Sequence, residues 1–560
     1  MPAPVVVHPS EEWDKSDGPW ANFALQVGTP PQNVQVHISI AEKETWVVGA
    51  GGCNTSMIEP IPDCANSRGE LFQPLNSSSW QYASSVWQNE GFFYLSEQLT
   101  RDLGTNAMGE YGYESVGLSF RGESGPALNK TVVAAFNATD FVIGQFGVNP
   151  NSISFTSEND NSSQLNDQTP SFLSRLHDEG HVPSRSFSFT AGSHARKTSN
   201  KNAFGSFIFG GYDSSLKGDN DMSFGFLNNE NRELTVGVQS ITKDGSTNLL
   251  ATPILAALDS SQPNIWLPLE ACQAFEQAFN LTWNSTAKQY LLDSASHDRL
   301  LKENSNVTFR LANNGDFGGE NIDIVLPFSA FDLKRRDSTS TFQPYFPLKR
   351  AHNDSQASFT SEKSLKLLSI LQIALGRAFF QEAYLIADYD KRTFSLSQRR
   401  WSDDAQDIVP IPLPPRKPLP DGAIAGIVVG VVMGVGIVVA ALIWWFRRRR
   451  ATIIESRRSS TIKVEPSTPA TIESKIFELG EAGNVYIPLQ EQQVRVHEMP
   501  STPGAMELDG SGNVYIPPRE QQPRVHEMPA EGPMYELAAE SLQCELEGTP
   551  RPKENPLETK

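Results

Sequence analysis

The residues of this chain that could perform acid–base or nucleophilic chemistry include a histidine and a serine two positions apart. His37 and Ser39 lie in Val34–Ile40, where apolar and polar residues alternate, so both side chains would point to the same face of a strand. With a distant carboxylate such as Asp259, they have the composition of a Ser-His-Asp catalytic set. A satisfied or surface histidine is far more common than such a set.

Metal and cofactor chemistry have little support. The nine histidines are scattered and the four cysteines contain no C-x-x-C pair, so no zinc-ligand pattern is present. The net charge of −19 argues against nucleic acid and other acidic partners. We therefore expect no metal, no cofactor and no nucleic acid.

Residues 1–400, which contain the elements that must position these residues, are predicted to be mainly β-strand. Short alternating or β-branched runs are separated by Gly, Pro, Asn and Asp, and they predict strands at Phe23–Val27, Val34–Ile40, Thr45–Val48, Ser186–Thr190, Ser206–Phe209, Leu234–Ile241, Asn306–Leu311, Ala383–Ala387 and Thr393–Leu396. Helical patterns are best at Pro170–His177 and Leu269–Phe279. Because so many short strands exceed one sandwich, we expect two β domains.

The segment Phe23–Val48 (FALQVGTPPQNVQVHISIAEKETWVV) resembles the N-terminal active-site region of pepsin-like aspartic peptidases. In that family a VGTPPQ turn precedes a strand, a D-T-G catalytic loop and a second strand with Trp-Val. Further segments resemble family motifs in the same order: Phe141–Gly147 (FVIGQFG), Pro170–Pro183, Gly205–Ser215 (GSFIFGGYDSS), Ala256–Pro268 (AALDSSQPNIWLP) and Ile373–Ser397, which begins IALGRAFF where the family has I-L-G-D-x-F-L.

This resemblance implies an all-β, bilobal, double β-barrel ectodomain with a cleft between its lobes. The implied organisation is an N-terminal segment (1–17), a first lobe (18–195) and a second lobe (196–400), with the boundary near residues 192–205.

A pepsin-like site needs two carboxylates, one from each lobe, which hold one water and share one proton. In the second loop Asp259-Ser260-Ser261 stands at the D-T-G position, so Asp259 retains a carboxylate. In the first loop the matching residues are Ser39-Ile40-Ala41, so Ser39 replaces the aspartate. Loss of one general acid or base typically costs about 10²–10⁴ in rate, and a cooperating pair loses more. The resemblance therefore implies an inactive ectodomain that binds or senses a peptide or protein in its cleft.

Other features bear on this interpretation. The Y-G-x-G flap of the family is missing from Gly91–Gly112, which contains Tyr94 and Tyr111 but not that motif. Replacement of the lost carboxylate by Glu42 or Glu44 needs a register shift, and charged loop residues are usually solvated. An active membrane-anchored aspartic endopeptidase working at acid pH is the alternative, and a structural surface protein without a ligand is a third class.

The cysteines predict one small oxidised loop. Cys53 and Cys64 lie close together in the ectodomain, at a place where many relatives carry a disulfide. A family disulfide often starts near the position of Cys272, but its partner is absent here, and Cys544 lies in the tail.

A transmembrane helix is predicted at Gly422–Phe446, which has no charge over 25 residues and precedes four arginines, Arg447 to Arg450. The arginines predict a cytoplasmic C-terminal tail and an extracellular or luminal ectodomain. The N-x-S/T acceptor pattern supports this topology, since all nine copies precede the span: Asn54, Asn76, Asn129, Asn137, Asn161, Asn280, Asn284, Asn306 and Asn353. We expect a single-pass glycoprotein of the plasma membrane or secretory pathway.

The first 17 residues contain no apolar run long enough for a signal peptide. Either the native N-terminus precedes this sequence or the single span directs insertion, and the first alternative is favoured.

The segments around the span have their own character. The linker (401–421) contains the proline-rich stretch Val409–Pro420, which should be a stiff, extended spacer, and 447–560 should be a disordered tail. The tail holds two similar segments, 484–500 and 513–529, which are either docking motifs or a duplication without function, and its cytosolic partner is unknown.

Four glycines in the span lie four residues apart and would allow homodimerisation: Gly422, Gly426, Gly430 and Gly434.

Overall fold

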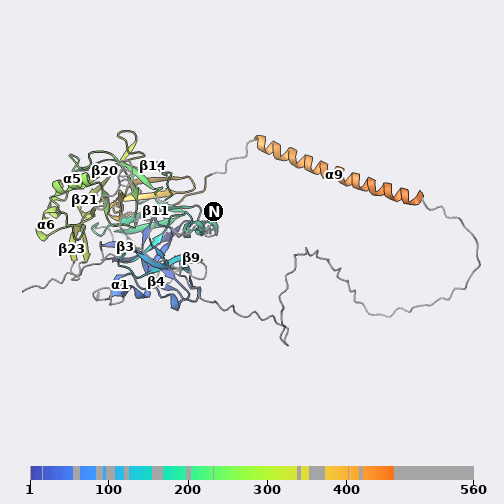
Figure 1. The fold of residues 1–560 in the computed structure, drawn as a ribbon. Helices are drawn as coiled ribbons and strands as arrows, with labels where there is room; N and C mark the ends of the chain where they lie inside the picture. Colours follow the sequence, from blue (N-terminus) through green and yellow to red (C-terminus); the bar gives the residue numbers. More distant parts are fainter. Residues whose placement is uncertain are drawn as a thin grey trace, which may run out of the picture. The chain divides into compact units, whose positions relative to one another are not determined.

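The computed structural model describes residues 2–14, 17–53, 63–82, 92–95, 107–118, 125–139, 141–153, 168–196, 203–230, 232–336, 342–351, 372–401, 403–414 and 421–458. Within these ranges the chain up to residue 414 is mainly β-strand, as predicted (Figure 1). Before residue 414, every strand and helix predicted from the sequence is present, with ends that differ by a few residues at most. The predicted helix Leu269–Phe279 matches α5 at both ends.

The first part of the chain forms a nine-stranded sheet that closes on itself. Its strand order is β2 (Pro9–Asp14), β3 (Trp20–Val27), β4 (Gln32–Ser39), β10 (Gly144–Gly147), β5 (Thr45–Val48), β9 (Ala127–Phe136), β8 (Met108–Gly117) and β6 (Gln81–Tyr82), with β7 (Phe92–Tyr94) paired to β8. An additional pairing of β3 with β8 closes the sheet into a barrel-like lobe. The predicted disulfide between Cys53 and Cys64 is present in this lobe, after β5.

The later part of the chain forms a second β lobe. An eight-stranded sheet has the order β21 (Asn321–Pro327), β20 (Asn306–Ala312), β15 (Thr235–Lys243), β17 (Ile254–Leu258), β25 (Ala374–Leu375), β18 (Ile265–Leu267) and β24 (Leu348–Arg350), with β16 (Thr247–Asn248) paired to β15. A smaller sheet contains β19 (Tyr290–Leu291), β23 (Phe342–Phe346) and β22 (Leu333–Arg336). The helices α5 and α6 (Ser294–Glu303) belong to the same region.

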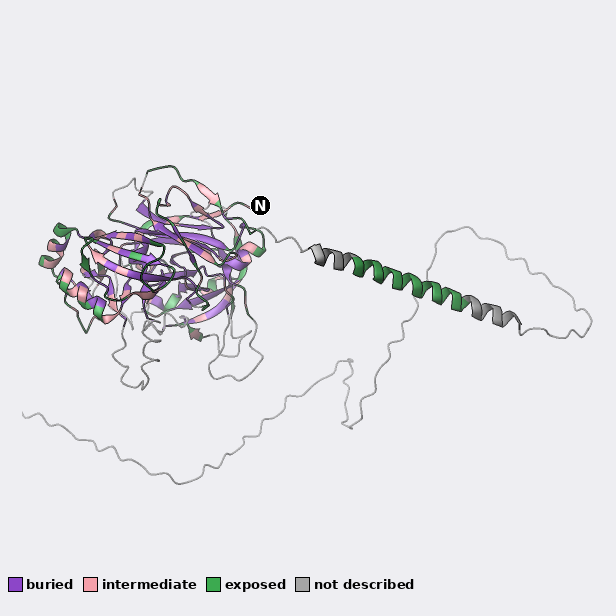
Figure 2. Cartoon of the chain, turned by 90° about the horizontal axis from the view of Figure 1, so that it is seen from above, coloured by how far each residue is buried: buried purple, intermediate pink, exposed green. Residues whose placement is uncertain are grey.

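A six-stranded sheet combines strands from widely separated parts of the chain. Its order is β1 (Val5–Val7), β12 (Phe204–Phe209), β11 (Ser186–Gly192), β26 (Ala383–Asp388), β27 (Thr393–Gln398) and β14 (Met222–Gly225). One continuous apolar cluster includes side chains from this sheet and from both lobes, which unites them in one core. Figure 2 shows the strands of this folded part largely buried.

The two lobes repeat one local arrangement of three strands. In the first lobe β10 lies between β4 and β5, parallel to β4 and antiparallel to β5. In the second lobe β25 lies in the same way between β17 and β18. Close backbone approach needs glycine here, because a Cβ on Gly147 would lie 2.3 Å from the Glu44 carbonyl oxygen, and one on Gly376 would lie 2.2 Å from that of Asn264. Each arrangement leaves one loop at the end of its first strand.

The proline-rich linker is not a free spacer over its whole length. Residues Ile408–Pro410 form β28, which pairs with β13 (Gly211–Asp213). The hydroxyl of Ser184 donates to the Ile411 carbonyl oxygen (2.5 Å), and the Ile411 N–H donates to the Gly210 carbonyl oxygen (2.9 Å). The start of the predicted spacer Val409–Pro420 is therefore paired and packed against the folded part through Val409–Ile411, and its residues 415–420 lie outside the described residues.

A long helix follows the linker. The helix α9 spans Asp421–Arg458, and its segment Val429–Arg449 is long and apolar enough to cross a membrane. The apolar side chains of that segment are exposed, as Figure 2 shows. The helix extends twelve residues beyond Phe446, so the prediction of disorder from residue 447 was wrong for the start of the tail. Both tail repeats lie outside the described residues.

Replacement of Ile411 by alanine tests the docking of β28. Because the side chain is buried against the folded part, we expect Ile411→Ala to lower the free energy of unfolding by about 2–4 kcal/mol. Leu413→Ala is the matched control, because Leu413 is exposed and should change it by less than about 0.5 kcal/mol. Thermal unfolding of the purified protein measures both, and equal melting temperatures for the two variants would show that the strand is not docked.

Candidate functional site

Ser39 is the last residue of β4 and is fully buried. Its backbone is held on one side by β10, where it lies opposite Gly147, and the Val148 N–H donates to its carbonyl oxygen (3.0 Å). Its hydroxyl accepts a hydrogen bond from the Glu42 N–H (3.2 Å). The side chain is therefore fixed at the end of the strand, where the loop to β5 begins.

Asp259 follows the last residue of β17 and is also fully buried. Its Oδ1 accepts a hydrogen bond from the Ser261 N–H (2.9 Å), which turns the carboxyl group back toward its own loop. Its Oδ2 has no hydrogen-bond partner among the residues that the structure describes. One carboxyl oxygen is thus oriented by the loop, and the other is buried without a hydrogen bond from the described residues.

A single hydroxyl connects the two loops. The Ser260 hydroxyl donates to the Ile38 carbonyl oxygen (2.7 Å) and accepts from the Ile40 N–H (3.0 Å). These two backbone groups flank Ser39, and Ser260 follows Asp259 directly. Residues about 220 positions apart in the sequence are therefore fixed beside one another by two buried hydrogen bonds. We refer to this pair of bonds as the Ser260 clasp.

The surroundings of Asp259 favour its neutral form. Burial raises the pKa of its carboxyl group, while the hydrogen bond from Ser261 and the charges of Arg377 and Arg232 act in the opposite direction. A carboxyl group that keeps its proton is able to act as an acid, but it cannot take a proton from water. Ser39 has no group that ionises in the acid range, so it supplies no base.

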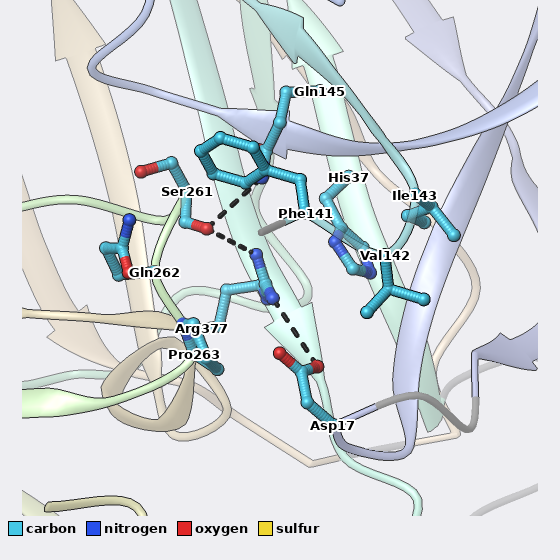
Figure 3. A pocket seen from close by; sticks show the side chains of 10 residues that line it. All are labelled: Asp17, His37, Phe141, Val142, Ile143, Gln145, Ser261, Gln262, Pro263 and Arg377. Atoms are coloured by element: carbon cyan, nitrogen blue, oxygen red, sulfur yellow. Dashed lines mark hydrogen bonds and ion pairs between the residues drawn. The ribbon is translucent and has the colours of Figure 1, made fainter. Parts of the chain in front are cut away.

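His37 does not join Ser39 and Asp259 in a catalytic set. Its Nε2 lies 3.3 Å from Asp14 Oδ2, and within the described part of the chain no hydrogen bond connects the imidazole to Ser39. Burial lowers the pKa of His37, and the charge of Arg377 lowers it further, which favours the neutral ring. The histidine lines a cavity of about 50 Å³ next to the two loops (Figure 3).

Arg377 is the residue of this region that the sequence analysis missed. It occupies the motif position at which the family has Asp, and that reversal of charge was a signal in the sequence. Its Nη1 donates to the carbonyl oxygens of Ser260 (3.0 Å) and Ser261 (2.9 Å), as the close-up in Figure 3 shows for Ser261. The side chain is 4% exposed and packs over the ring of Trp20. A buried cation thus holds the loop that carries Asp259.

Glu42 and Glu44 are buried rather than solvated, so this expectation from the sequence was wrong. Glu42 is 1% exposed, and its backbone contacts both Ser39 and Asn149, whose N–H donates to the Glu42 carbonyl oxygen (3.0 Å). The loop turns inward because β10 approaches it closely at Gly147. In the sequence, Glu42 is the acidic residue of the first lobe that lies nearest to Ser39, and in the structure its side chain is buried.

The hairpin of β7 and β8 occupies the region where the family flap was expected. The Tyr111 hydroxyl donates to the Tyr94 carbonyl oxygen (3.2 Å), and the Tyr111 ring is buried while the Tyr94 side chain is half exposed. The segment between the two strands, residues 96–106, lies outside the described residues.

The remaining residues singled out from the sequence are Cys272 and the acceptor asparagines. Cys272 is a buried free thiol, and burial raises its pKa to about 12, so it is unreactive. Asn54, Asn161 and Asn353 lie outside the described residues. The other acceptor asparagines are exposed: Asn76, Asn129, Asn137, Asn280, Asn284 and Asn306.

The two β lobes, the repeated three-strand arrangement and the paired loops define a bilobal, pepsin-like aspartic protease domain. Comparison with known sequences gives the same class, because the model of the family "Eukaryotic aspartyl protease" matches residues 23–399. The chain belongs to this family. It is also 22% identical to Aspartic proteinase 3 of Saccharomyces cerevisiae over 443 residues, which cover 69% of this chain and 70% of the relative.

Ser260→Ala should remove the clasp without altering either candidate catalytic side chain. The Ile38 carbonyl and the Ile40 N–H would both remain buried without their partner, so we expect a loss of about 2–4 kcal/mol in stability. Ser260→Thr keeps the hydroxyl and should unfold within a few degrees of the parent. Thermal unfolding monitored by near-ultraviolet circular dichroism compares the three proteins, and an unchanged alanine variant would contradict the clasp.

Asp259→Asn should stabilise the protein increasingly as the pH rises. The folded-state pKa of Asp259 lies above its unfolded value, so its favourable contribution is complete below about pH 4 and is lost as the pH rises through the folded pKa. Asparagine stays neutral and keeps the acceptor for the Ser261 N–H. We expect the melting temperatures to agree near pH 4 and to differ by about 2 °C or more at pH 7. A difference that shrinks with pH would refute the neutral carboxyl.

Proposed function

We propose that this protein is a membrane-anchored glycoprotein whose pepsin-like ectodomain binds or senses a peptide or protein without cleaving it. The observation that carries the proposal is Ser39, which holds the place of one of the two carboxylates that the reaction needs. The ligand would lie in the cleft that the family fold has between its lobes. In this proposal the protein binds extended peptides, as the family does, but does not hydrolyse them.

The environment of the two loops supports the absence of hydrolysis. Activation of water requires an ionised carboxylate paired with a protonated one. Burial favours the protonated form of Asp259, and the Ser39 hydroxyl is occupied by the Glu42 N–H. An acid is therefore present at these positions, but its basic partner is not.

An active acid endopeptidase is the second candidate, and the burial of Glu42 favours it. Glu42 lies three residues after Ser39 and belongs to the same loop, so a carboxylate of the first lobe is close in sequence to the lost position. The yeast relative is named a proteinase. In this alternative, Glu42 and Asp259 would share the roles of base and acid.

The membrane part of the proposal rests on α9 and on the distribution of acceptor asparagines. The segment Val429–Arg449 would anchor the chain, with the arginines on the cytoplasmic side and the ectodomain outside or in the lumen. The six exposed acceptor asparagines would then be accessible to glycosylation. The glycines Gly422, Gly426, Gly430 and Gly434 would allow two such helices to pack closely.

Cleavage of a broad peptide library from pH 3 to 7 tests the function. We expect no cleavage above background by the full-length protein in detergent, with Asp259→Asn as the catalytic control. A repaired variant, Ser39→Asp with Ala41→Gly, should gain measurable cleavage at acid pH if the rest of the site is intact.

Glu42→Gln separates the two candidates. If the parent cleaves peptides and both Glu42→Gln and Asp259→Asn lower the rate by about 10²-fold or more, the binding proposal is wrong and Glu42 is the replacement carboxylate. Fluorescence anisotropy with the same peptides measures binding in the absence of cleavage. A protein that neither cleaves nor binds any peptide would contradict both candidates.

A further inference from the structure

The cavity beside the two loops contains a buried cation whose donors are mostly unused. Arg377 satisfies the Ser260 and Ser261 carbonyl oxygens through Nη1 alone. Its Nε has no hydrogen-bond partner among the described residues, and Nη2 lies 3.8 Å from Asp17 Oδ1, beyond hydrogen-bond distance. Figure 3 shows this guanidinium among the side chains that line the cavity.

The open donors form one edge of the guanidinium group. Nε and Nη2 present two parallel N–H groups, which match an oxygen acceptor that approaches in the guanidinium plane. Burial without such an acceptor is costly, because an unsatisfied charged donor forfeits the hydrogen bonds that it makes in water. The geometry therefore points to an oxygen atom of a molecule that is not part of this chain.

An unused acceptor lines the same cavity. The Gln145 side chain is 1% exposed, and its Nε2 donates to the Ser261 carbonyl oxygen (3.2 Å), the same oxygen that accepts from Arg377. Its Oε1 has no hydrogen-bond partner in the described part of the chain. Besides the Arg377 edge and Gln145 Oε1, the lining residues His37 and Ser261 contribute Nε2 and Oγ without hydrogen bonds, and Phe141, Val142, Ile143 and Pro263 form an apolar wall.

The size of the cavity admits a small planar group. Its volume of about 50 Å³ is several times the ~10–15 Å³ that one water molecule needs. Asp17, whose side chain is 29% exposed, also lines the cavity. The loop residues Ser261 and Gln262 place the cavity directly beside the segment that follows Asp259.

The charges around Arg377 decide between a carboxylate and a neutral amide. Asp17 and Asp14 already interact electrostatically with the guanidinium, and Asp14 also lies against His37. A bound carboxylate would add a third negative group around one cation. A carboxamide adds no charge, its oxygen accepts from the Arg377 edge, and its NH₂ group donates to Gln145 Oε1.

We propose that this cavity receives the carboxamide side chain of a glutamine or asparagine in the bound peptide. Arg377 and Gln145 are the residues that determine this specificity, and the apolar wall contacts the methylene groups of the incoming side chain. The inference rests on the proposed peptide binding and adds the chemical class of one ligand residue. It applies equally to a peptide that is bound and to one that is cleaved.

A set of peptide pools tests the proposal on the full-length protein in detergent micelles at pH 7. Each pool of octapeptides has one position fixed as Gln, Asn, Glu or Met, and retention on the immobilised protein is measured by mass spectrometry. We expect Gln or Asn to be enriched about tenfold over both Glu and Met at one position, since a hydrogen bond to a charged donor supports at least that factor.

Two variants assign the preference to the cavity. Gln145→Met keeps the side-chain size and should lower the amide preference while other positions retain their ranking. Arg377→Met should abolish the preference, and Arg377→Lys should not restore it, because lysine lacks the parallel donor edge. Arg310→Met is the matched control, since that arginine pairs with Asp323 on the exposed side of β20. Thermal unfolding of each variant verifies that it remains folded.

The outcomes are distinguishable. A preference for Glu at this position would show that the carboxylate displaces Asp17 and would overturn the amide assignment. Retention without a preference between Gln and Met would show that the cavity holds only water. Failure of every pool to bind the parent protein would overturn the proposed function, and this inference with it. A preference that survives in both Gln145→Met and Arg377→Met would place it elsewhere.

Discussion

Two buried hydrogen bonds to the Ser260 hydroxyl fix the relation between the lobes at the candidate site. The donor and acceptor that it pairs flank Ser39, and Ser260 itself adjoins Asp259, so the loops cannot move apart without exposing or orphaning backbone groups. Arg377 reinforces the second loop by binding its carbonyl oxygens from the other side. The corresponding position in the first loop is Ile40, which has no hydroxyl, so the loops are connected from one side only. The chain thus has the architecture that places the two loops beside each other, with Ser39 at the start of one and Asp259 at the start of the other.

This separation of architecture from chemistry is physically reasonable. The clasp, the inserted strands β10 and β25 and their close glycines contribute to stability whether or not a reaction occurs. A pair of carboxylates, by contrast, places two like charges close together. This arrangement is unfavourable for stability and is retained only where the reaction needs it. In the proposed function, a serine at position 39 would remove that repulsion. The burial of Asp259 then favours its neutral form, which suits a residue that contributes hydrogen bonds rather than charge.

Much of the fold was readable from the sequence because its strands are marked by alternation and by turn residues. Thr45–Val48 and Leu269–Phe279 were predicted with the bounds that the structure has, and Cys53 pairs with Cys64 as expected. The positions of Ser39 and Asp259 at the ends of matching strands followed from flanking motifs. The burial of Glu42 was not predictable, since it depends on the approach of β10, more than 100 residues later. The docking of Ile411 was missed for the same reason, because proline content reports local stiffness and not a partner strand.

The short pair formed by β13 and β28 also has a mechanical consequence. Residues after Ile411 lead from the pepsin-like domain to the apolar helix, so tension applied along the chain from the helix would reach β28 before the rest of the domain. Three residue pairs and the Ile411 contacts would bear this load before any strand of the central sheet. Because β28 is so short, it would detach at low force and lengthen the tether by about 3.3 Å for each residue released. Release of β28 would thereby protect the core of the pepsin-like domain from the pulling force.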